Sequence, residues 1–288
     1  MPKLSAVIEA LDELYDPAWA SDWDAVGLVC GDPEHPVSRV LFAIDPEAVV
    51  LAEAVEWGAD LIVTHHPLFL RPVHGFAAVT PKGRLVHELI RNGIALHVCH
   101  TNADAANPGV SDALARSIGL TGDLRPLDPM PMNPSLGIGR VGQLRRAESL
   151  GMFAERVRRA LPTTGHGVRV AGDPDRPVQT VAVSGGAGDS YLDRVRQIGV
   201  DVYLTADLRH HPAAEFRQHP DAPALLDVAH WASEWPWLAK AAEDLSRTLA
   251  VRHAPDTVET RVSGIPTDPW NQRSFVNSFE KSENGGRP

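Results

Sequence analysis

Two stretches of the chain repeat the same alternation of strand-like and helix-like patterns, which restricts the fold more than any other feature. In the first stretch, residues 39–44 and 59–64 are apolar and rich in β-branched side chains, as in buried strands. Residues 46–58 between them have the pattern of a helix that ends at a glycine. Strand, helix and strand within about 30 residues form a βαβ unit with a parallel strand pair. The sequence therefore predicts an α/β fold.

The second stretch, residues 180–212, repeats this layout, and Gly58-Ala59-Asp60 aligns with Gly199-Val200-Asp201. A further strand follows each unit, in ALHVCHTNADAA and ALLDVAHWASE, and both end in a histidine and then a carboxylate. Three matches in the same order indicate an internal duplication. We therefore expect two pseudo-repeated α/β lobes with largely parallel or mixed sheets, over residues 1–125 and 126–270. In an alternative arrangement, the C-terminal part of the second lobe returns to the first lobe.

Two other segments have patterns of irregular structure. Residues 126–137, PLDPMPMNPSLG, are rich in proline, and we expect a loop or linker there. Residues 271–288 are polar and end in Gly-Gly-Arg-Pro, so we expect a disordered tail. No run of about 18 apolar residues occurs, and we expect no membrane-spanning helix.

The net charge of the chain limits the kinds of molecule that it is expected to bind. The chain has 27 Lys and Arg residues against 37 Asp and Glu, a net charge of −10, and no long basic run. This argues against nucleic acid or an anionic membrane as the main partner, and leaves metal cations and small molecules. Cys30 and Cys99 are the two cysteines, which rules out a disulfide framework and a Cys-based zinc ribbon. Two lone thiols fit a cytoplasmic location.

Histidines gather where the predicted strands end, and ligands of open α/β sheets bind outside the carboxyl ends of the strands. Seven of the 13 histidines lie in such segments: His65, His66, His97, His100, His210, His211 and His230. Two carboxylates accompany them, Asp104 four residues after His100 and Glu234 four residues after His230. Pro67 follows the first pair and forces a turn, so both imidazoles can enter one cleft and hold two different metals.

Each of these residues also has a plain structural alternative. The His65-His66 pair can be one core and one surface histidine, Asp104 can cap a helix or sit in a turn, and Glu234 can be an exposed cap residue. Taken together they supply three imidazoles and two carboxylates, a set that fits Zn, Mn, Fe or Co better than Ca or Mg. A glutamate can bridge two cations, as two-metal hydrolytic sites require.

Two other kinds of catalytic site lack support. The chain has no nucleophile-elbow Gly-x-Ser-x-Gly, and its glycine-rich segment over residues 184–190 lacks the Gly-Lys-Ser/Thr ending of a P-loop. That segment joins a strand to a helix. It either offers backbone N–H groups to an anion or is a tight turn that needs glycines.

Six segments, in order, resemble the Nif-three-like dinuclear metal centre hexameric protein family, whose members are often labelled GTP cyclohydrolase 1 type 2. They are SDWDAVGLVCGD, DLIVTHHPLF, HTNADAANPGVSDALA, YLTADLRHHPA, AHWASE and SGIPTDPW. The resemblance covers about residues 2–270. It implies two α/β lobes with a site for two divalent metal ions in the cleft between them, and a ring of six identical chains.

The resemblance also implies roles for single residues. Carried over one by one, the metal ligands are His65, His66, Asp104, His230 and Glu234, with Glu234 as the bridge. His100 is implied as a proton donor beside them. Asp207, His210 and His211 are implied to lie near the metals or to face the substrate. A four-residue insertion before His210 and His211, compared with the first repeat, should set this pair back from the metals.

Two positions depart from the family pattern. Ala25 stands where the family motif WDNVGL has asparagine, and Pro266 stands where an Asn-Thr-Asp-Pro motif begins. All five implied ligands are intact. The sequence supports two hypotheses of different class. The first is a dinuclear metal-dependent hydrolase of a nucleotide or a related small molecule, with GTP implied by the family label, in which His100 moves a proton. The second is a non-catalytic metal-binding or regulatory scaffold.

Overall fold

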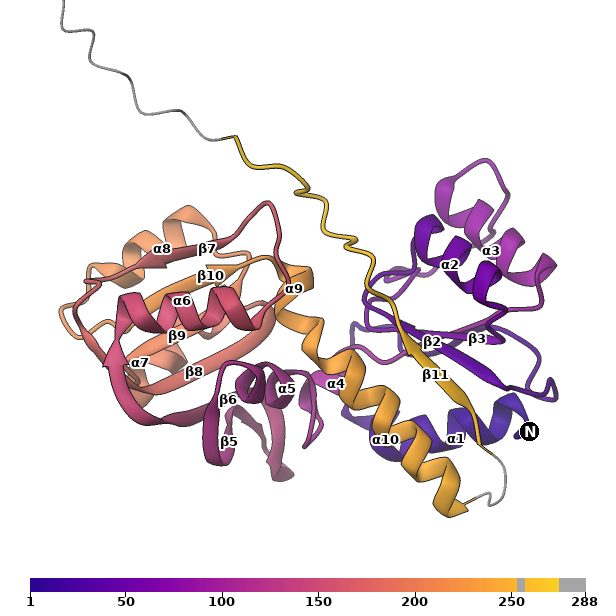
Figure 1. The fold of residues 1–288 in the computed structure, drawn as a ribbon, viewed down its shortest axis with the longest axis horizontal. Coiled ribbons are helices and arrows are strands. Elements are labelled where there is room, and N and C mark those ends of the chain that lie inside the picture. The colour runs from indigo at the N-terminus through magenta and orange to yellow at the C-terminus, as the bar shows by residue number, and fades with distance from the viewer. Residues whose placement is uncertain (253–256, 275–288) are drawn as a thin grey trace, which may run out of the picture.

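A computed structural model describes residues 1–252 and 257–274, so most of the predicted tail, from residue 275 on, lies outside the described residues. Two separate β-sheets organise the chain, each with helices packed against it, and they lie side by side (Figure 1). Both sheets contain parallel strands and antiparallel additions. The prediction of an α/β fold with parallel or mixed sheets is confirmed.

The first sheet has the strand order β1-β4-β3-β2-β11. Its strands are β1 (Gly27–Cys30), β2 (Arg39–Ala43), β3 (Leu61–Thr64), β4 (Ala95–Val98) and β11 (Glu259–Val262). All of them are parallel except β1. Alternate residues of the strands enter two different apolar clusters, so both faces of the sheet are covered. The covering helices are α1 (Leu4–Leu14) and α10 (Pro236–Arg252) on one face, and α2 (Ala48–Trp57) and α3 (Pro81–Arg91) on the other.

The second sheet has the order β5-β6-β8-β9-β10-β7, and its parallel centre is β8, β9 and β10. Its strands are β5 (Leu120–Met130), β6 (Asn133–Ser149), β7 (Val168–Ala171), β8 (Pro177–Ala187), β9 (Val202–Ala206) and β10 (Ala224–Val228). Two apolar clusters again lie on its two faces. They contain α5 (Val110–Ser117) with α6 (Leu150–Ala160), and α7 (Leu192–Ile198) with α8 (His210–Arg217).

The prediction of a loop or linker over residues 126–137 is wrong. Pro126 to Met130 belong to β5 and Asn133 to Gly137 belong to β6, with a short turn between the two strands. β5 lies at the edge of the sheet and has β6 as its neighbour. Proline is tolerated on an edge strand because its missing N–H breaks no bond to a second neighbour. Pro126 and Pro129 therefore mark an edge strand and not a linker.

The chain passes from the second sheet back to the first near its end. The short helix α9 (His230–Glu234) follows β10 and leads into α10, which packs on the first sheet, and β11 then pairs with β2. α4 (Thr101–Ala105) follows β4 in the same way that α9 follows β10. Short 3₁₀ turns, η1 (Pro17–Trp19) and η2 (Asp189–Tyr191), complete the described elements. The division into residues 1–125 and 126–270 stays a prediction.

The two βαβ units repeat each other in detail. Gly58 ends α2 and Gly199 ends α7 with the same left-handed φ of 73°. Asp60 accepts hydrogen bonds from two successive backbone N–H groups at the start of β2, over 2.7 and 2.9 Å. Asp201 accepts the same pair from β8, over 2.9 and 2.7 Å. The aspartate that opens the second strand of each unit thus fixes the neighbouring parallel strand.

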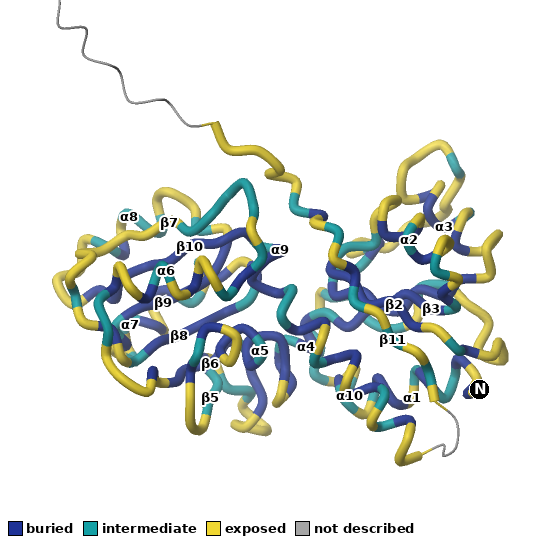
Figure 2. The backbone as a smooth tube through the Cα atoms, viewed as in Figure 1, coloured by how far each residue is buried: buried dark blue, intermediate teal, exposed yellow. Residues whose placement is uncertain are grey.

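Burial follows the layers that this topology creates. The central strands are buried along most of their length, whereas the outer faces of the helices are exposed (Figure 2). None of the described helices combines the length and the hydropathy that crossing a bilayer requires.

Candidate metal centre

Five side chains from both sheets converge at the carboxyl ends of parallel strands. His65 and His66 directly follow β3, and His100 follows β4. His230 and Glu234 are the first and last residues of α9, directly after β10. Their donor atoms form two groups, each within 4.8 Å: His65 with His66 and His100, and His66 with His230 and Glu234. Three segments distant in the sequence therefore meet at one place.

Glu234 lies at the middle of this cluster. One of its oxygens, Oε1, is 3.1 Å from Nε2 of His230 and 3.5 Å from Nε2 of His65. Its other oxygen, Oε2, is 3.1 Å from Nε2 of His66. Asp104 approaches from α4, with Oδ1 3.8 Å from Nε2 of His65. Both oxygens of Glu234 therefore face imidazole nitrogens, at distances of 3.1–3.5 Å.

The opposite nitrogen of each histidine is held by an oxygen acceptor. An Nδ1 held in this way fixes the tautomer and the orientation of the ring, as around metal-binding histidines. The four pairs are His65 with the Cys99 carbonyl (2.9 Å), His66 with Asp45 (2.7 Å), His100 with Asp24 (2.8 Å) and His230 with Asp207 (2.7 Å). Nε2 of all four rings is thereby left for the interior of the cluster.

Sequence reasoning missed the roles of Asp24 and Asp45. Asp45 follows the end of β2, where the position of a carboxylate after a strand was a usable signal. It also accepts a hydrogen bond from the Thr267 hydroxyl over 2.5 Å, so the last described segment reaches the cluster. Asp24 is fixed by Thr101, whose backbone N–H and hydroxyl both donate to Oδ2. Asp24 lies before the first strand, where no periodic pattern marked it.

A glycine brings the backbone of β8 against Glu234. Gly186 has a left-handed φ of 67°, and its N–H donates to the Ser233 hydroxyl over 2.9 Å. A Cβ atom at Gly186 would lie 2.5 Å from Oε1 of Glu234 and 3.1 Å from Nε2 of His230. Both distances are too short for a side chain to be added without displacing the carboxylate. Gly186 therefore allows close packing of β8 against the cluster, whereas Gly188 packs against Thr205 and Tyr203.

Opposite charges within the cluster shift the pKa values of its members. Burial opposes the ionised form of Glu234, but the positive charges of His230, His66 and His65 hold its pKa well below the ordinary value. Burial likewise opposes protonation of His66, but Glu234 and Asp45 raise its pKa to about 10. Glu234 raises the pKa of His230 to about 11, against the effect of burial. The buried carboxylate of Glu234 therefore needs positive charge beside it to stay ionised. Protons on the histidines or metal cations can supply that charge.

Two buried polar atoms test whether a metal fits this centre. Among the described residues, Nε2 of His65 and Oε2 of Glu234 make no hydrogen bond, although each lies within ion-pair distance of a partner in the cluster. An unpaired buried polar atom is costly, and native structures leave few of them unexplained. Both atoms belong to the residue types that bind Zn, Fe, Mn or Co, and Nε2 of His65 lies 3.5 Å from the other oxygen of Glu234. The donor set therefore fits a divalent cation.

Other sequence-predicted residues lie elsewhere. His97 is buried within β4 and is not part of the cluster. His210 and His211 begin α8, are exposed, and contact each other with ring centroids 5.2 Å apart. In the described ranges, neither belongs to a group of donor atoms that could hold a metal ion. Asp207 does reach the centre, because it holds the His230 ring. The substrate-facing role of His210 and His211 stays a prediction.

Comparisons with known proteins agree with the fold and with the sequence pattern. The family model of Duf34/NIF3 (NGG1p interacting factor 3) matches residues 2–269. The chain is 55% identical to a GTP cyclohydrolase 1 type 2 homolog of Streptomyces coelicolor, over 100% of both chains. It is 37% identical to a homolog of the same name from Mycobacterium leprae, over 93% of this chain and 95% of the other.

Solved structures show the same fold. A Bacillus cereus protein related to NIF3 matches with a TM-score of 0.86 and 24% identity, over 96% of this chain and 99% of the other. A Staphylococcus aureus hypothetical protein matches with a TM-score of 0.85 and 25% identity, over 96% and 100%.

Proposed function

The chain belongs to the Duf34/NIF3 family, and from that premise we propose that it is a dinuclear metal-dependent hydrolase of a nucleotide or a related small molecule. The observation that carries the proposal is the convergence of three imidazole Nε2 atoms on the two oxygens of Glu234. The name of the relatives, GTP cyclohydrolase 1 type 2 homolog, supports GTP as the first substrate to examine.

In this proposal two divalent cations, Zn, Fe, Mn or Co, are the cofactors. His65 and Asp104 would hold one cation, and His66 and His230 would hold the other, with Glu234 serving both. The support is that two buried atoms of this set, Nε2 of His65 and Oε2 of Glu234, make no hydrogen bond with the described residues. Imidazoles combined with carboxylates match these metals better than an all-oxygen shell would.

Bound there, the cations would supply Lewis-acid chemistry, which activates water and stabilises negative charge that develops on a substrate oxygen. His100 is the group that would move a proton. Its Nδ1 is held by Asp24, and its Nε2 faces the cluster with ring centroids 5.0 Å from His65 and 5.6 Å from His66. Because Thr101 fixes Asp24 through two hydrogen bonds, the His100 ring is positioned before a substrate arrives.

The assembly and the location are also proposals. The family resemblance supports a ring of six chains, and two lone thiols support a cytoplasmic location. Light scattering on the purified protein tests the first of these, since a mass other than six times 31.2 kDa would refute the ring.

The experiment for the main proposal is metal analysis of purified protein followed by a nucleotide panel with and without chelator. We expect two metal ions per chain, and GTP turnover that chelation abolishes. His66→Ala and Glu234→Ala should lower the metal content well below that of the parent while the fold survives. Unchanged metal content in both variants would refute the ligand assignment. A fully loaded protein that leaves every nucleotide intact would refute the hydrolase and favour the metal-binding scaffold.

A further inference from the structure

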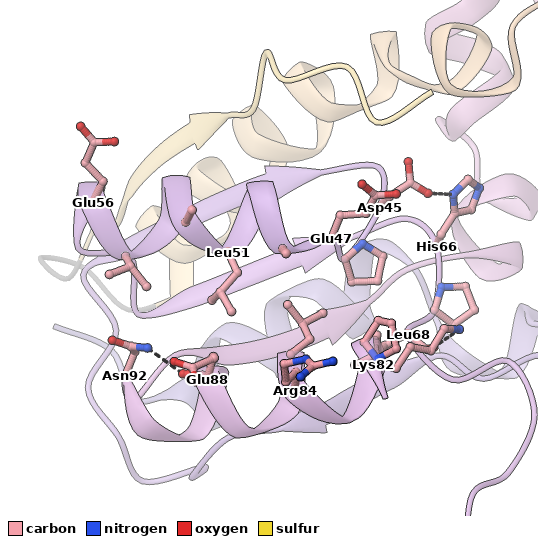
Figure 3. Close-up of a pocket in the computed structure, with 17 residues that line it drawn as sticks. Asp45, Glu47, Leu51, Glu56, His66, Leu68, Lys82, Arg84, Glu88 and Asn92 are labelled. Atoms are coloured by element: carbon pink, nitrogen blue, oxygen red, sulfur yellow. Dashed lines mark hydrogen bonds and ion pairs between the residues drawn. The ribbon is translucent and has the colours of Figure 1, made fainter. Parts of the chain in front are cut away.

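A groove of about 1040 Å³ runs between α2 and α3 on the outer face of the first sheet. Figure 3 shows Asp45 and His66 at one end of the groove, Glu56 and Asn92 at the other, and Leu51 pointing between the two helices. The volume is at the upper end of the range of small-molecule sites, about 300–1,000 Å³. The groove therefore has room for a ligand larger than the metals themselves.

The groove has an apolar floor and small residues in one wall. Leu51, Leu68 and Leu85 are buried and line it. On the α2 side, Ala48 and Ala52 are exposed and also line it, so the helix carries no bulky side chains there to close the gap to α3. An apolar ligand body placed on this floor would remove exposed apolar surface from water, which is favourable.

The groove and the metal centre share two residues. Asp45 and His66 line the groove and are also the hydrogen-bonded pair whose imidazole Nε2 lies 3.1 Å from Glu234. A ligand that fills the groove therefore ends against a residue that we propose as a metal ligand. Because it shares these residues with the metal centre, the groove differs from an ordinary surface depression.

Two positive side chains line the groove, Lys82 and Arg84, and Arg84 is the one without a hydrogen-bond partner among the described residues. The ammonium group of Lys82 donates to the Leu68 carbonyl over 2.5 Å. The Arg84 side chain, in contrast, makes no hydrogen bond or ion pair with any described residue.

Glu47 and Glu56 line the groove from the α2 side, and Glu88, which pairs with Arg91, lines it from α3. Arg84 is therefore a local positive group on α3 in a groove that also carries carboxylates. An unpaired guanidinium beside an apolar floor suits a carboxylate, sulfonate or phosphate.

We propose that this groove binds an organic anion with an apolar body, whose charged group pairs with Arg84 and whose other end abuts His66. A nucleotide is one molecule of this class, with a flat base and a phosphate. The inference rests on the proposed function only in this last identification, because the groove, its floor and Arg84 do not depend on a metal.

The test uses the full-length protein and a fluorescent probe of this class, 1-anilinonaphthalene-8-sulfonate, with affinity measured by titration. Ala52→Trp should fill the groove, and Arg84→Gln should remove its free positive charge. Each change should weaken probe binding about tenfold or more, as expected for the loss of one well-placed charged contact or of the space itself. Metal content should stay at the parent value in both variants.

Two matched variants serve as controls. Val49→Trp adds the same ring to the exposed surface of α2 outside the groove, and Arg71→Gln removes an exposed positive charge outside the groove. Both should bind the probe as the parent does. The proposal is overturned if Ala52→Trp and Val49→Trp bind the probe equally well, or if Arg84→Gln has no more effect than Arg71→Gln.

A competition step connects the groove to the proposed function. GTP should displace the probe from the parent protein, and the displacement should be lost in Arg84→Gln. If Ala52→Trp and Arg84→Gln weaken probe binding as expected but GTP fails to displace the probe, the groove is confirmed as an anion site and a nucleotide is excluded as its ligand. Metal content, measured on the same samples, shows separately whether the metal centre itself has failed.

Discussion

Nδ1 of His66 lies 2.7 Å from Oδ1 of Asp45, and this pair joins the end of β2 to the end of β3. The other oxygen of Asp45 accepts the Thr267 hydroxyl, so the carboxylate is fixed on both sides. Asp207 holds His230 over the same distance from the second sheet. Each lobe thus contributes an aspartate that aims one imidazole at Glu234.

The first prediction concerns this aiming. Asp45→Ala leaves all proposed ligands in place but removes the acceptor that orients His66. Loss of such an outer partner weakens metal affinity by about 10- to 100-fold. Titration of the metal-free protein against a competing chelator measures the change. Asp175→Ala, in an exposed turn, is the control and should bind metal as the parent does. An unaltered affinity in Asp45→Ala would show that the ring is held by other means.

The second prediction concerns the approach of β8 to Glu234. Gly186→Ala places a Cβ atom within 2.5 Å of Oε1, so the carboxylate must move and metal binding should weaken about tenfold or more. Gly199→Ala is the matched control, because its φ of 73° is close to the 67° of Gly186, yet a Cβ there meets nothing within 4 Å. Both variants should lose about 1–2 kcal/mol of stability from the strained backbone.

Metal affinity and thermal unfolding are measured for both glycine variants. The comparison separates the effect of backbone strain, which both variants share, from that of the contact between the new Cβ atom and Glu234. Equal metal affinity in Gly186→Ala and Gly199→Ala, at equal loss of stability, would show that the backbone of β8 does not position Glu234.

The sequence predicted those parts of the fold that periodic patterns encode. The repeated βαβ layout predicted the parallel strands of both sheets. Gly58 and Gly199 end their helices in the same way, and Asp60 and Asp201 hold the neighbouring strands in the same way. The linker prediction failed because proline content does not distinguish an edge strand from a loop. Whether β5 lies at an edge depends on the order of strands in the sheet, which no local window contains.

The candidate site was predictable to a similar extent. His65 and Glu234 were named from strand ends and spacing, and the structure places them 3.5 Å apart. Asp24 was not named, because its contact with His100 joins residues 76 positions apart and depends on the packing of an irregular segment. His97 was grouped with the other histidines, but it lies inside β4 and not beyond its end. β4 ends one residue after His97, and a strand two residues shorter would place His97 beyond its end.

A third prediction follows from the burial of His97. Burial lowers its pKa from 6.5 to about 4, and its Nδ1 has no hydrogen-bond partner among the described residues. The folded chain keeps this ring neutral, whereas the unfolded chain binds a proton below pH 6.5. The stability that depends on the neutral ring is therefore present above pH 6.5 and is lost as the pH falls toward 4.

Between pH 7 and pH 5, this linkage should lower the free energy of unfolding by about 2 kcal/mol in the parent. His97→Leu has no titrating group at this position, so it should lose about 2 kcal/mol less over the same interval. Urea unfolding of both proteins at the two pH values, under the same metal conditions, measures the difference. Parallel pH dependences would show that His97 is not held neutral.

The last prediction concerns Arg140, which is fully buried in β6 and ties the second sheet to the segment that carries Asp104. Its guanidinium lies 2.7 Å from Oδ2 of Asp112 and also donates to the carbonyl of Ala106, just after α4. Arg140→Ala leaves the Asp112 carboxylate without its positive partner and should cost about 3–5 kcal/mol of unfolding free energy. Arg145→Ala, on the same strand but exposed, should cost no more than about 0.5 kcal/mol. Denaturant unfolding compares the two variants. Equal stability would mean that the buried pair is not what joins these elements.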